Sequence, residues 1–74
     1  MEHEIDMRGV ACPMNFVKTK LFLDKLPVGD LLHVLLDAGE PVINVCQSLT
    51  QEGHEILAQN EHEEGHFRIT VRKV

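Results

Sequence analysis

Cys12 is the residue whose type and position best suit chemistry, because it lies just before a predicted helix. Proline is favoured at the first position of a helix, where its missing N–H needs no partner, so Pro13 predicts that Cys12 is the N-cap residue. There the thiol would lie beside unpaired backbone N–H groups and the positive end of the helix dipole, which both favour a thiolate. Cysteines in such positions are the reactive ones, so Cys12 is predicted to be a reactive thiol.

Arg8 and Gly9, which precede Cys12 in the motif, are expected to support it. Gly9 lets the connection turn tightly and brings the backbone close to the sulfur. Arg8 either adds positive charge near the sulfur or recognises an acidic partner, or it forms a surface salt bridge with Asp6 or Asp24. The motif contains no histidine to act as a general base, which suits a carrier, since a carrier needs none.

The segment from Asp6 to Lys20 resembles the signature of the TusA/SirA-like sulfur-carrier family. That signature is Asp, one residue, Arg-Gly, two residues, and then Cys-Pro-x-Pro entering a helix. The order and lengths of the predicted elements over nearly all 74 residues fit the family too. The chain departs from it at Asn15, where the family usually has a second proline. We expect Asn15 at about the third helical position, with a small local effect on the surface around the thiol.

The resemblance implies that the protein carries sulfur in a relay. In the family, the motif cysteine takes a sulfane sulfur from a cysteine desulfurase or rhodanese-like donor and passes it to an acceptor cysteine on another protein. Cys12 would hold the persulfide, supported by Arg8, Gly9 and Pro13, without a cofactor or a metal. Such a relay turns over no small molecule alone. The pathway stays open among tRNA thiolation, molybdenum-cofactor sulfuration and sulfur oxidation.

Two other functions remain open. The chain is either an interaction or regulatory module in which Cys12 is only a helix cap, or a thiol-redox protein in which Cys12 pairs with Cys46. A redox protein would ordinarily need a resolving thiol nearby, as in Cys-x-x-Cys, and the motif has none. His62 and His66 flank a predicted hairpin turn without a recognised ligand spacing, so we predict no metal site.

Length and charge restrict the remaining possibilities. The chain of 74 residues allows one small domain spanning residues 1–74. Seven basic and twelve acidic residues give a net charge of −5, which argues against direct nucleic-acid binding. No apolar stretch approaches the ~20 residues needed to span a bilayer, and the acidic start Met1-Glu2-His3-Glu4 is unlike a signal peptide. We therefore expect a cytoplasmic protein that does not bind membranes.

The helix after Pro13 is predicted to end near Leu26 and has apolar residues on two faces. The face with Phe16, Leu23 and Leu26 is predicted to pack in the core. The opposite face is then partly exposed. It is either ordinary surface or a docking site beside Cys12, unless the two faces are assigned the wrong way round and this face packs in the core. The candidate docking residues are Met14, Asn15, Val17, Lys18 and Leu21.

The rest of the chain alternates strand and helix patterns. Strands are predicted at 3–7, 31–37, 54–59 and 67–72, with a helix from Pro41 to about Gly53 and a turn at 60–65. The buried face of that helix is Val42, Val45, Cys46 and Leu49. The order βαβαββ predicts an α+β fold, a two-layer sandwich with two helices on one face of a mixed four-stranded sheet. The resemblance implies the same architecture, similar to the C-terminal domain of translation initiation factor three.

Overall fold

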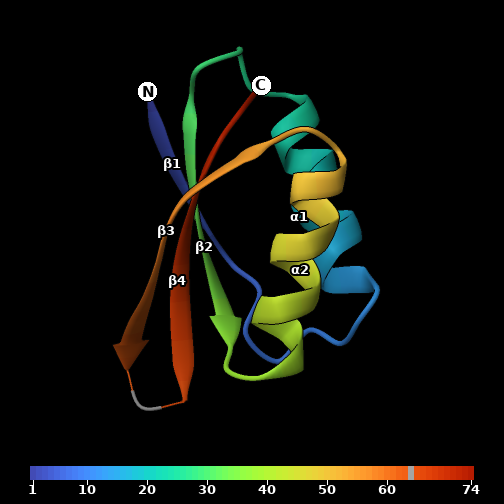
Figure 1. The fold of residues 1–74 in the computed structure, drawn as a ribbon, viewed down its shortest axis with the longest axis vertical. Helices are drawn as coiled ribbons and strands as arrows, with labels where there is room; N and C mark the ends of the chain where they lie inside the picture. The colour runs from blue at the N-terminus through green and yellow to red at the C-terminus, as the bar shows by residue number, and fades with distance from the viewer. Residues whose placement is uncertain (64) are drawn as a thin grey trace.

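Six secondary-structure elements follow one another in the predicted order βαβαββ (Figure 1). The computed structural model describes residues 1–63 and 65–74, and of residues 62 and 63 it describes the backbone alone. The elements are β1 (Glu2–Asp6), α1 (Met14–Asp24), β2 (Leu31–Asp37), α2 (Glu40–Gln51), β3 (Glu55–Glu63) and β4 (His66–Arg72).

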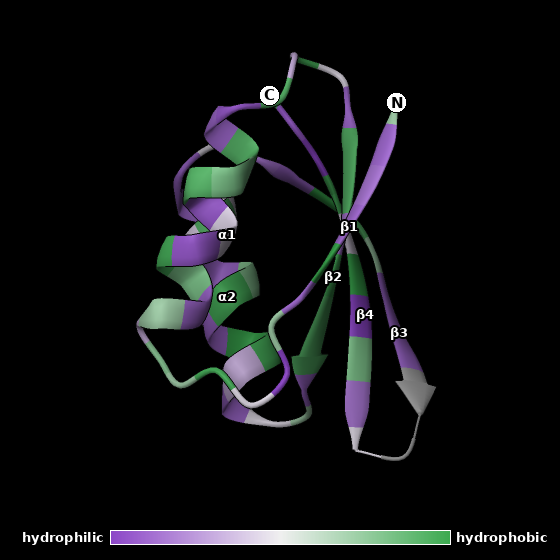
Figure 2. Cartoon of the chain, turned by 180° about the vertical axis from the view of Figure 1, so that it is seen from behind, coloured by the Kyte–Doolittle hydropathy of each residue, from purple (hydrophilic) through white to green (hydrophobic). Residues whose placement is uncertain are grey.

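The four strands form one mixed sheet in the order β1-β2-β4-β3. β1 lies parallel to β2, whereas β4 is antiparallel to both of its neighbours. Both helices cover the same face of this sheet (Figure 1 and Figure 2). The predicted two-layer α+β sandwich is therefore confirmed.

The core lies between the sheet and the two helices. The alternation of apolar and polar residues along β4, visible in Figure 2, puts Ile69 and Val71 on the helix side, where both are fully buried. α2 buries the predicted stripe, whose residues recur at the spacing of one helix face. The buried residues of that stripe are Val42, Val45, Cys46 and Leu49.

The two apolar faces of α1 are oriented as predicted. Leu23 is fully buried, and Phe16 and Leu26 pack against the core while partly exposed. Met14 and Leu21 lie on the opposite side and are exposed. The inverted arrangement of the faces is thereby excluded.

Several predicted boundaries differ from the structure, and the largest differences are at the ends of α1 and β3. α1 ends at Asp24 and not near Leu26, because the N–H groups of Lys25 and Leu26 donate to carbonyls only three residues back and close a tighter turn. β3 runs to Glu63, so the strand occupies much of the turn predicted at 60–65. Residue 64 of that predicted turn lies outside the described residues.

The start of α1 also differs from the prediction. The N-cap residue is Pro13, and Cys12 is one residue outside the helix. An N-cap at position 12 would accept the N–H of Phe16 on its carbonyl, but this N–H donates to Oδ1 of Asn15 at 2.7 Å. The side chain of Asn15 thus competes with the backbone for the bond that would have made Cys12 the cap.

Candidate functional site

Cys12 is exposed in the segment that connects β1 to α1. Figure 1 shows that both helices begin in the lower half of the molecule, toward the end at which β2 finishes. The carboxyl ends of parallel strands and the helix starts that follow them form the usual place for functional residues in α/β units. The predicted reactive thiol therefore lies at the surface of this end. The peptide bond between Cys12 and Pro13 is cis.

The Cys12 sulfur has a polar neighbour on the other helix. Nδ2 of Asn44, in the second turn of α2, donates a hydrogen bond to Sγ of Cys12 at 3.8 Å. Asn44 was not predicted, because 32 residues separate it from Cys12 and no motif spacing links the two. The sulfur is thus contacted by an amide from α2.

The amides expected to face the sulfur have other partners. The N–H of Asn15 donates to the carbonyl of Ala11 at 3.1 Å, and that of Val17 donates to the carbonyl of Pro13 at 3.0 Å. The N–H of Phe16 is taken by the side chain of Asn15. The expectation that unpaired N–H groups at this helix start lie beside the thiol is therefore wrong for these three amides.

The turn before Cys12 is tied internally by Asp6 and Arg8. The Arg8 guanidinium donates from Nε to Oδ1 at 2.9 Å and from Nη2 to Oδ2 at 2.7 Å, and its backbone N–H donates to Oδ1 at 3.0 Å. The hydrogen bonds from the side chain and then the backbone of Arg8 lower the pKa of Asp6 from its usual 3.8 to about 2. Of the roles predicted for Arg8, the structure thus shows the salt bridge with Asp6.

Gly9 connects this turn to the sheet. Its φ of 77° lies in the left-handed region, which glycine adopts without the strain that a side chain would bring. Its N–H donates to Oδ2 of Asp37, the last residue of β2, at 2.8 Å. Asp37 was missed, although parallel pairing of Asp6 with Leu35 puts the end of β2 beside this turn.

Asn15 is not a docking residue, because it is fully buried. It lies on the inner face of α1 together with Thr19 and Leu23, which follow at intervals of four residues and are also fully buried. Within the part of the chain that the structure describes, its Nδ2 is buried without a hydrogen-bond partner. The spacing of four from Thr19 was the signal that would have placed Asn15 inside.

The other predicted docking residues are exposed. Met14, Val17 and Leu21 form a docking stripe along the outer face of α1 and are 48%, 37% and 57% exposed. Lys18, in the same helix, is exposed too. The sequence analysis did not single out Ile43, an exposed apolar residue adjacent in sequence to Asn44.

Comparison with known proteins decides the family. A family model described as "Sulfurtransferase TusA" matches residues 3–73. The chain belongs to the TusA family. The TusA/SirA-like resemblance noted at Asp6 to Lys20 is thereby confirmed.

Relatives within the TusA family span nearly the whole chain. A putative sulfur carrier protein of Archaeoglobus fulgidus is 38% identical over 69 residues, which are 93% of this chain and 78% of that protein. The sulfur carrier protein TusA of Allochromatium vinosum is 28% identical over 72 residues, which are 97% of this chain and 93% of that protein. The crystal structure of a SirA-like protein from Desulfitobacterium hafniense superposes with a TM-score of 0.83 at 24% identity and covers 95% of each chain, which confirms the fold.

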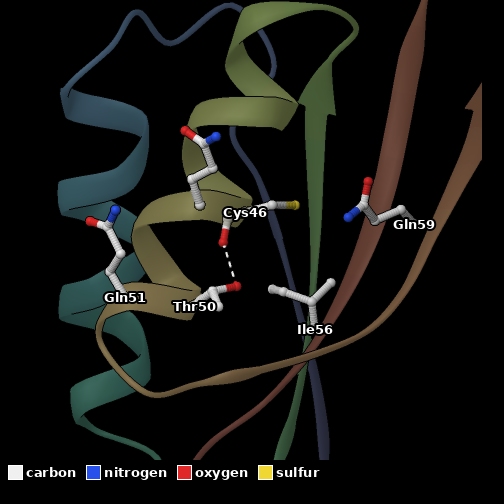
Figure 3. Close-up of a pocket in the computed structure, with 6 residues that line it drawn as sticks. Cys46, Thr50, Gln51, Ile56 and Gln59 are labelled. Carbon is white, nitrogen blue, oxygen red and sulfur yellow. Dashed lines mark hydrogen bonds between the residues drawn. The ribbon is translucent and has the colours of Figure 1, made fainter.

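The second cysteine of this TusA-family chain lies in a different environment. Cys46 is buried on the inner side of α2, and its side chain points toward the groove between α2 and β3 (Figure 3). Burial raises the pKa of its thiol. The groove has a volume of about 490 Å³ and is lined by Cys46, Gln47, Thr50, Gln51, Ile56 and Gln59. The prediction that Cys46 is buried is confirmed.

The described part of this TusA-family chain contains neither a cluster of metal-ligating side chains nor a helix suited to cross a membrane. Among the side chains described in 1–61 and 65–74, no three His, Cys, Asp or Glu residues are grouped so that they could hold a metal ion. His66 lies 3.7 Å from Asp37, while the side chain of His62 falls outside the description. No helix in the described ranges is long and apolar enough to cross a membrane.

Proposed function

We propose that this protein accepts a sulfane sulfur on Cys12 as a persulfide and hands it to a cysteine of a partner protein. The observation that carries the proposal is the exposed thiol of Cys12, held at the helix-start end of the molecule and contacted by the amide of Asn44. An exposed sulfur on a small domain can enter the active site of a larger donor. Membership of a family whose relatives are called sulfur carrier proteins supports the same role.

The transfer balances without a base or a cofactor. The Cys12 thiolate attacks the outer sulfur of the donor's persulfide, so that a new S–S bond forms at Sγ while the donor's S–S bond breaks. The electron pair of the broken bond leaves on the donor's thiolate. An acceptor thiolate then repeats the attack on the outer sulfur held by Cys12, and Cys12 returns to its starting form.

Partners are proposed to bind beside Cys12. The docking stripe begins two residues after this thiol, at Met14, and continues along α1 to Leu21. Its apolar side chains, with the positive charge of exposed Lys18, suit a donor such as a cysteine desulfurase or rhodanese-like protein, and then an acceptor protein. We place this relay in the cytoplasm, where two free cysteines stay reduced. The net charge of −5 argues against direct binding to nucleic acid.

Mass spectrometry tests the proposal. The protein is incubated with a cysteine desulfurase and cysteine, or with a rhodanese and thiosulfate, and the tryptic peptides are weighed before and after reduction. We expect one added sulfur on the Cys12 peptide that a reductant removes. The signal should be absent in Cys12→Ser and retained in Cys46→Ser. Sulfur found only on Cys46, or on neither cysteine with both donors, would overturn the proposal.

The exposed docking stripe also supports a second candidate, an interaction module in which the thiol has no role. Such a module would bind its partner through Met14, Val17 and Leu21 whatever residue occupies position 12. Equal capture of a partner by Cys12→Ser and wild-type protein, with undiminished pathway output, would favour it. Output lost in Cys12→Ser despite equal capture would favour the carrier.

The thiol-redox alternative receives less support from the geometry. Asn44 and Cys46 are two residues apart on α2, so their side chains leave the helix on roughly opposite sides. Asn44 contacts Cys12, whereas Cys46 points toward the groove beside β3 (Figure 3). α2 therefore lies between the two sulfurs.

A further inference from the structure

Asn44 presents its amide to the Cys12 sulfur from the second turn of α2. Its backbone lies in α2. Val42 and Val45, its near neighbours in the same helix, are buried. Asn44 itself is half-buried, which limits the freedom of its side chain. The helix thus places the Nδ2 donor 3.8 Å from Sγ of Cys12 before any reaction begins.

The backbone amides that begin α1 leave this function to a side chain. Three of them, those of Asn15, Phe16 and Val17, donate to other acceptors. Among the described residues, Asn44 on α2 donates to the Cys12 sulfur. A donor aimed at a neutral thiol interacts weakly, but the same donor aimed at an anionic sulfur forms a charge-assisted hydrogen bond about twice as strong.

We infer that Asn44 donates to Sγ of Cys12 in its thiolate form, the form that attacks the donor and that leaves when sulfur departs. This inference rests on the proposed carrier function. Asn44 therefore favours Cys12 as attacking group when sulfur arrives and as leaving group when sulfur departs.

The pH profile of Cys12 alkylation tests the contact without any sulfur transfer. The rate of iodoacetamide labelling is measured on the Cys12 peptide in wild type, Asn44→Asp, Asn44→Leu and Asn44→Gln. In Asn44→Asp a carboxylate replaces the donor and repels the thiolate, so the profile should move up by about one pH unit and the rate at pH 7 should fall about tenfold. In Asn44→Leu the labelling rate at pH 7 should fall about threefold. In Asn44→Gln, which keeps an amide, the rate should fall less.

The matched control is Asn60→Asp, the same chemical change at an exposed position of β3, the edge strand at the opposite side of the sheet from β1. It adds the same charge to the protein and should leave the alkylation profile unchanged. Circular dichroism checks that each variant is folded. A purely structural role of Asn44 would change stability but would not move the pH profile. Profiles of Asn44→Asp and Asn44→Leu that coincide with wild type would overturn the inference.

Loading with inorganic polysulfide separates this inference from the carrier function. Polysulfide needs no docking surface, so its rate of persulfide formation on Cys12 should fall in Asn44→Asp by the same factor as alkylation. Equal loading of Asn44→Asp and wild type would overturn the role of Asn44 while the carrier function stands. A displaced alkylation profile in a protein that no donor loads would support the Asn44 contact and overturn the carrier function.

Discussion

The carboxylate of Asp37 accepts a hydrogen bond from the backbone N–H of Gly9 at 2.8 Å. This bond ties the end of β2 to the turn that precedes Cys12. A second bond, from the N–H of Met7 to the carbonyl of Leu35 at 2.8 Å, extends the pairing of β1 and β2 to the start of the same turn. The position of the thiol is therefore set by the sheet as well as by α1.

Asp37→Ala should loosen the turn before Cys12. The variant loses a charge-assisted bond, and because Asp37 is partly exposed we expect the free energy of unfolding to fall by only about 1 kcal/mol. Local opening should increase more clearly, since the freed turn contains the Arg8–Gly9 bond that trypsin cleaves. Urea denaturation and the rate of tryptic cleavage at this bond measure the two effects. Glu61→Ala, which removes an exposed carboxylate on β3, should be cleaved by trypsin at the wild-type rate.

Asp6 should remain ionised to unusually low pH. The side-chain and backbone hydrogen bonds from Arg8 lower its pKa to about 2, so the stability that it contributes is complete above about 3.8 and is lost as the pH falls toward 2. Carbon-13 NMR of the aspartate carboxyl groups measures the midpoint directly. In Arg8→Ala the pKa of Asp6 should rise toward 3.8, whereas Arg72→Ala, which removes the partner of Glu55, should leave it low. A midpoint that stays near 2 in Arg8→Ala would contradict this assignment.

Much of the fold was predictable because α2 and β4 each have a clear apolar period. The stripe from Val42 to Leu49 predicted α2 and its buried face, and the alternation of Phe67, Ile69 and Val71 predicted β4. These patterns depend on the residues of one element alone. The hairpin of β3 and β4 was also correct, but its turn was predicted too long, because polar residues are compatible with a strand that lies at the sheet edge.

The site was predicted less completely because its contacts join distant parts of the chain. Cys12, Gly9 and the Asp6–Arg8 pair were found from their local spacing. Asp37 and Asn44 come from β2 and α2 and meet the motif only after the chain folds.

The cap prediction failed for a different reason. The preference of proline for the first helical position is weak enough to be overridden by one side chain. Here Oδ1 of Asn15 takes the N–H of Phe16, and the helix begins one residue later.

The two cysteines should differ sharply in reactivity. Cys12 is exposed, whereas burial both shields Cys46 and raises the pKa of its thiol. Near neutral pH, iodoacetamide should label one thiol per molecule, and in concentrated guanidinium chloride it should label both. Mass spectrometry should assign the native label to the Cys12 peptide, and Cys12→Ser should abolish it. Rapid labelling of both thiols in the native protein, or a disulfide between them under mild oxidation, would support the redox alternative.

Leu21→Ser should weaken partner binding without weakening the fold. Leu21 is 57% exposed at the far end of the docking stripe, so the free energy of unfolding should change by less than about 0.5 kcal/mol. A donor that covers the docking stripe while it reaches Cys12 loses the apolar contact with this side chain. We therefore expect the rate of desulfurase- or rhodanese-dependent loading to fall about fivefold at limiting donor concentration, since one exposed apolar contact contributes about 1 kcal/mol.

Two controls show whether such a loss comes from docking. Val28→Ser makes the same kind of change at a residue that is 77% exposed beyond the C-terminal end of α1, away from Cys12, and should load like wild type. Polysulfide, which needs no docking, should load Leu21→Ser at the wild-type rate. Because interface mutations act mostly by speeding dissociation of the complex, raising the donor concentration should restore loading of Leu21→Ser. Slow loading with polysulfide, or an equal loss in Val28→Ser, would show that the stripe does not bind the donor.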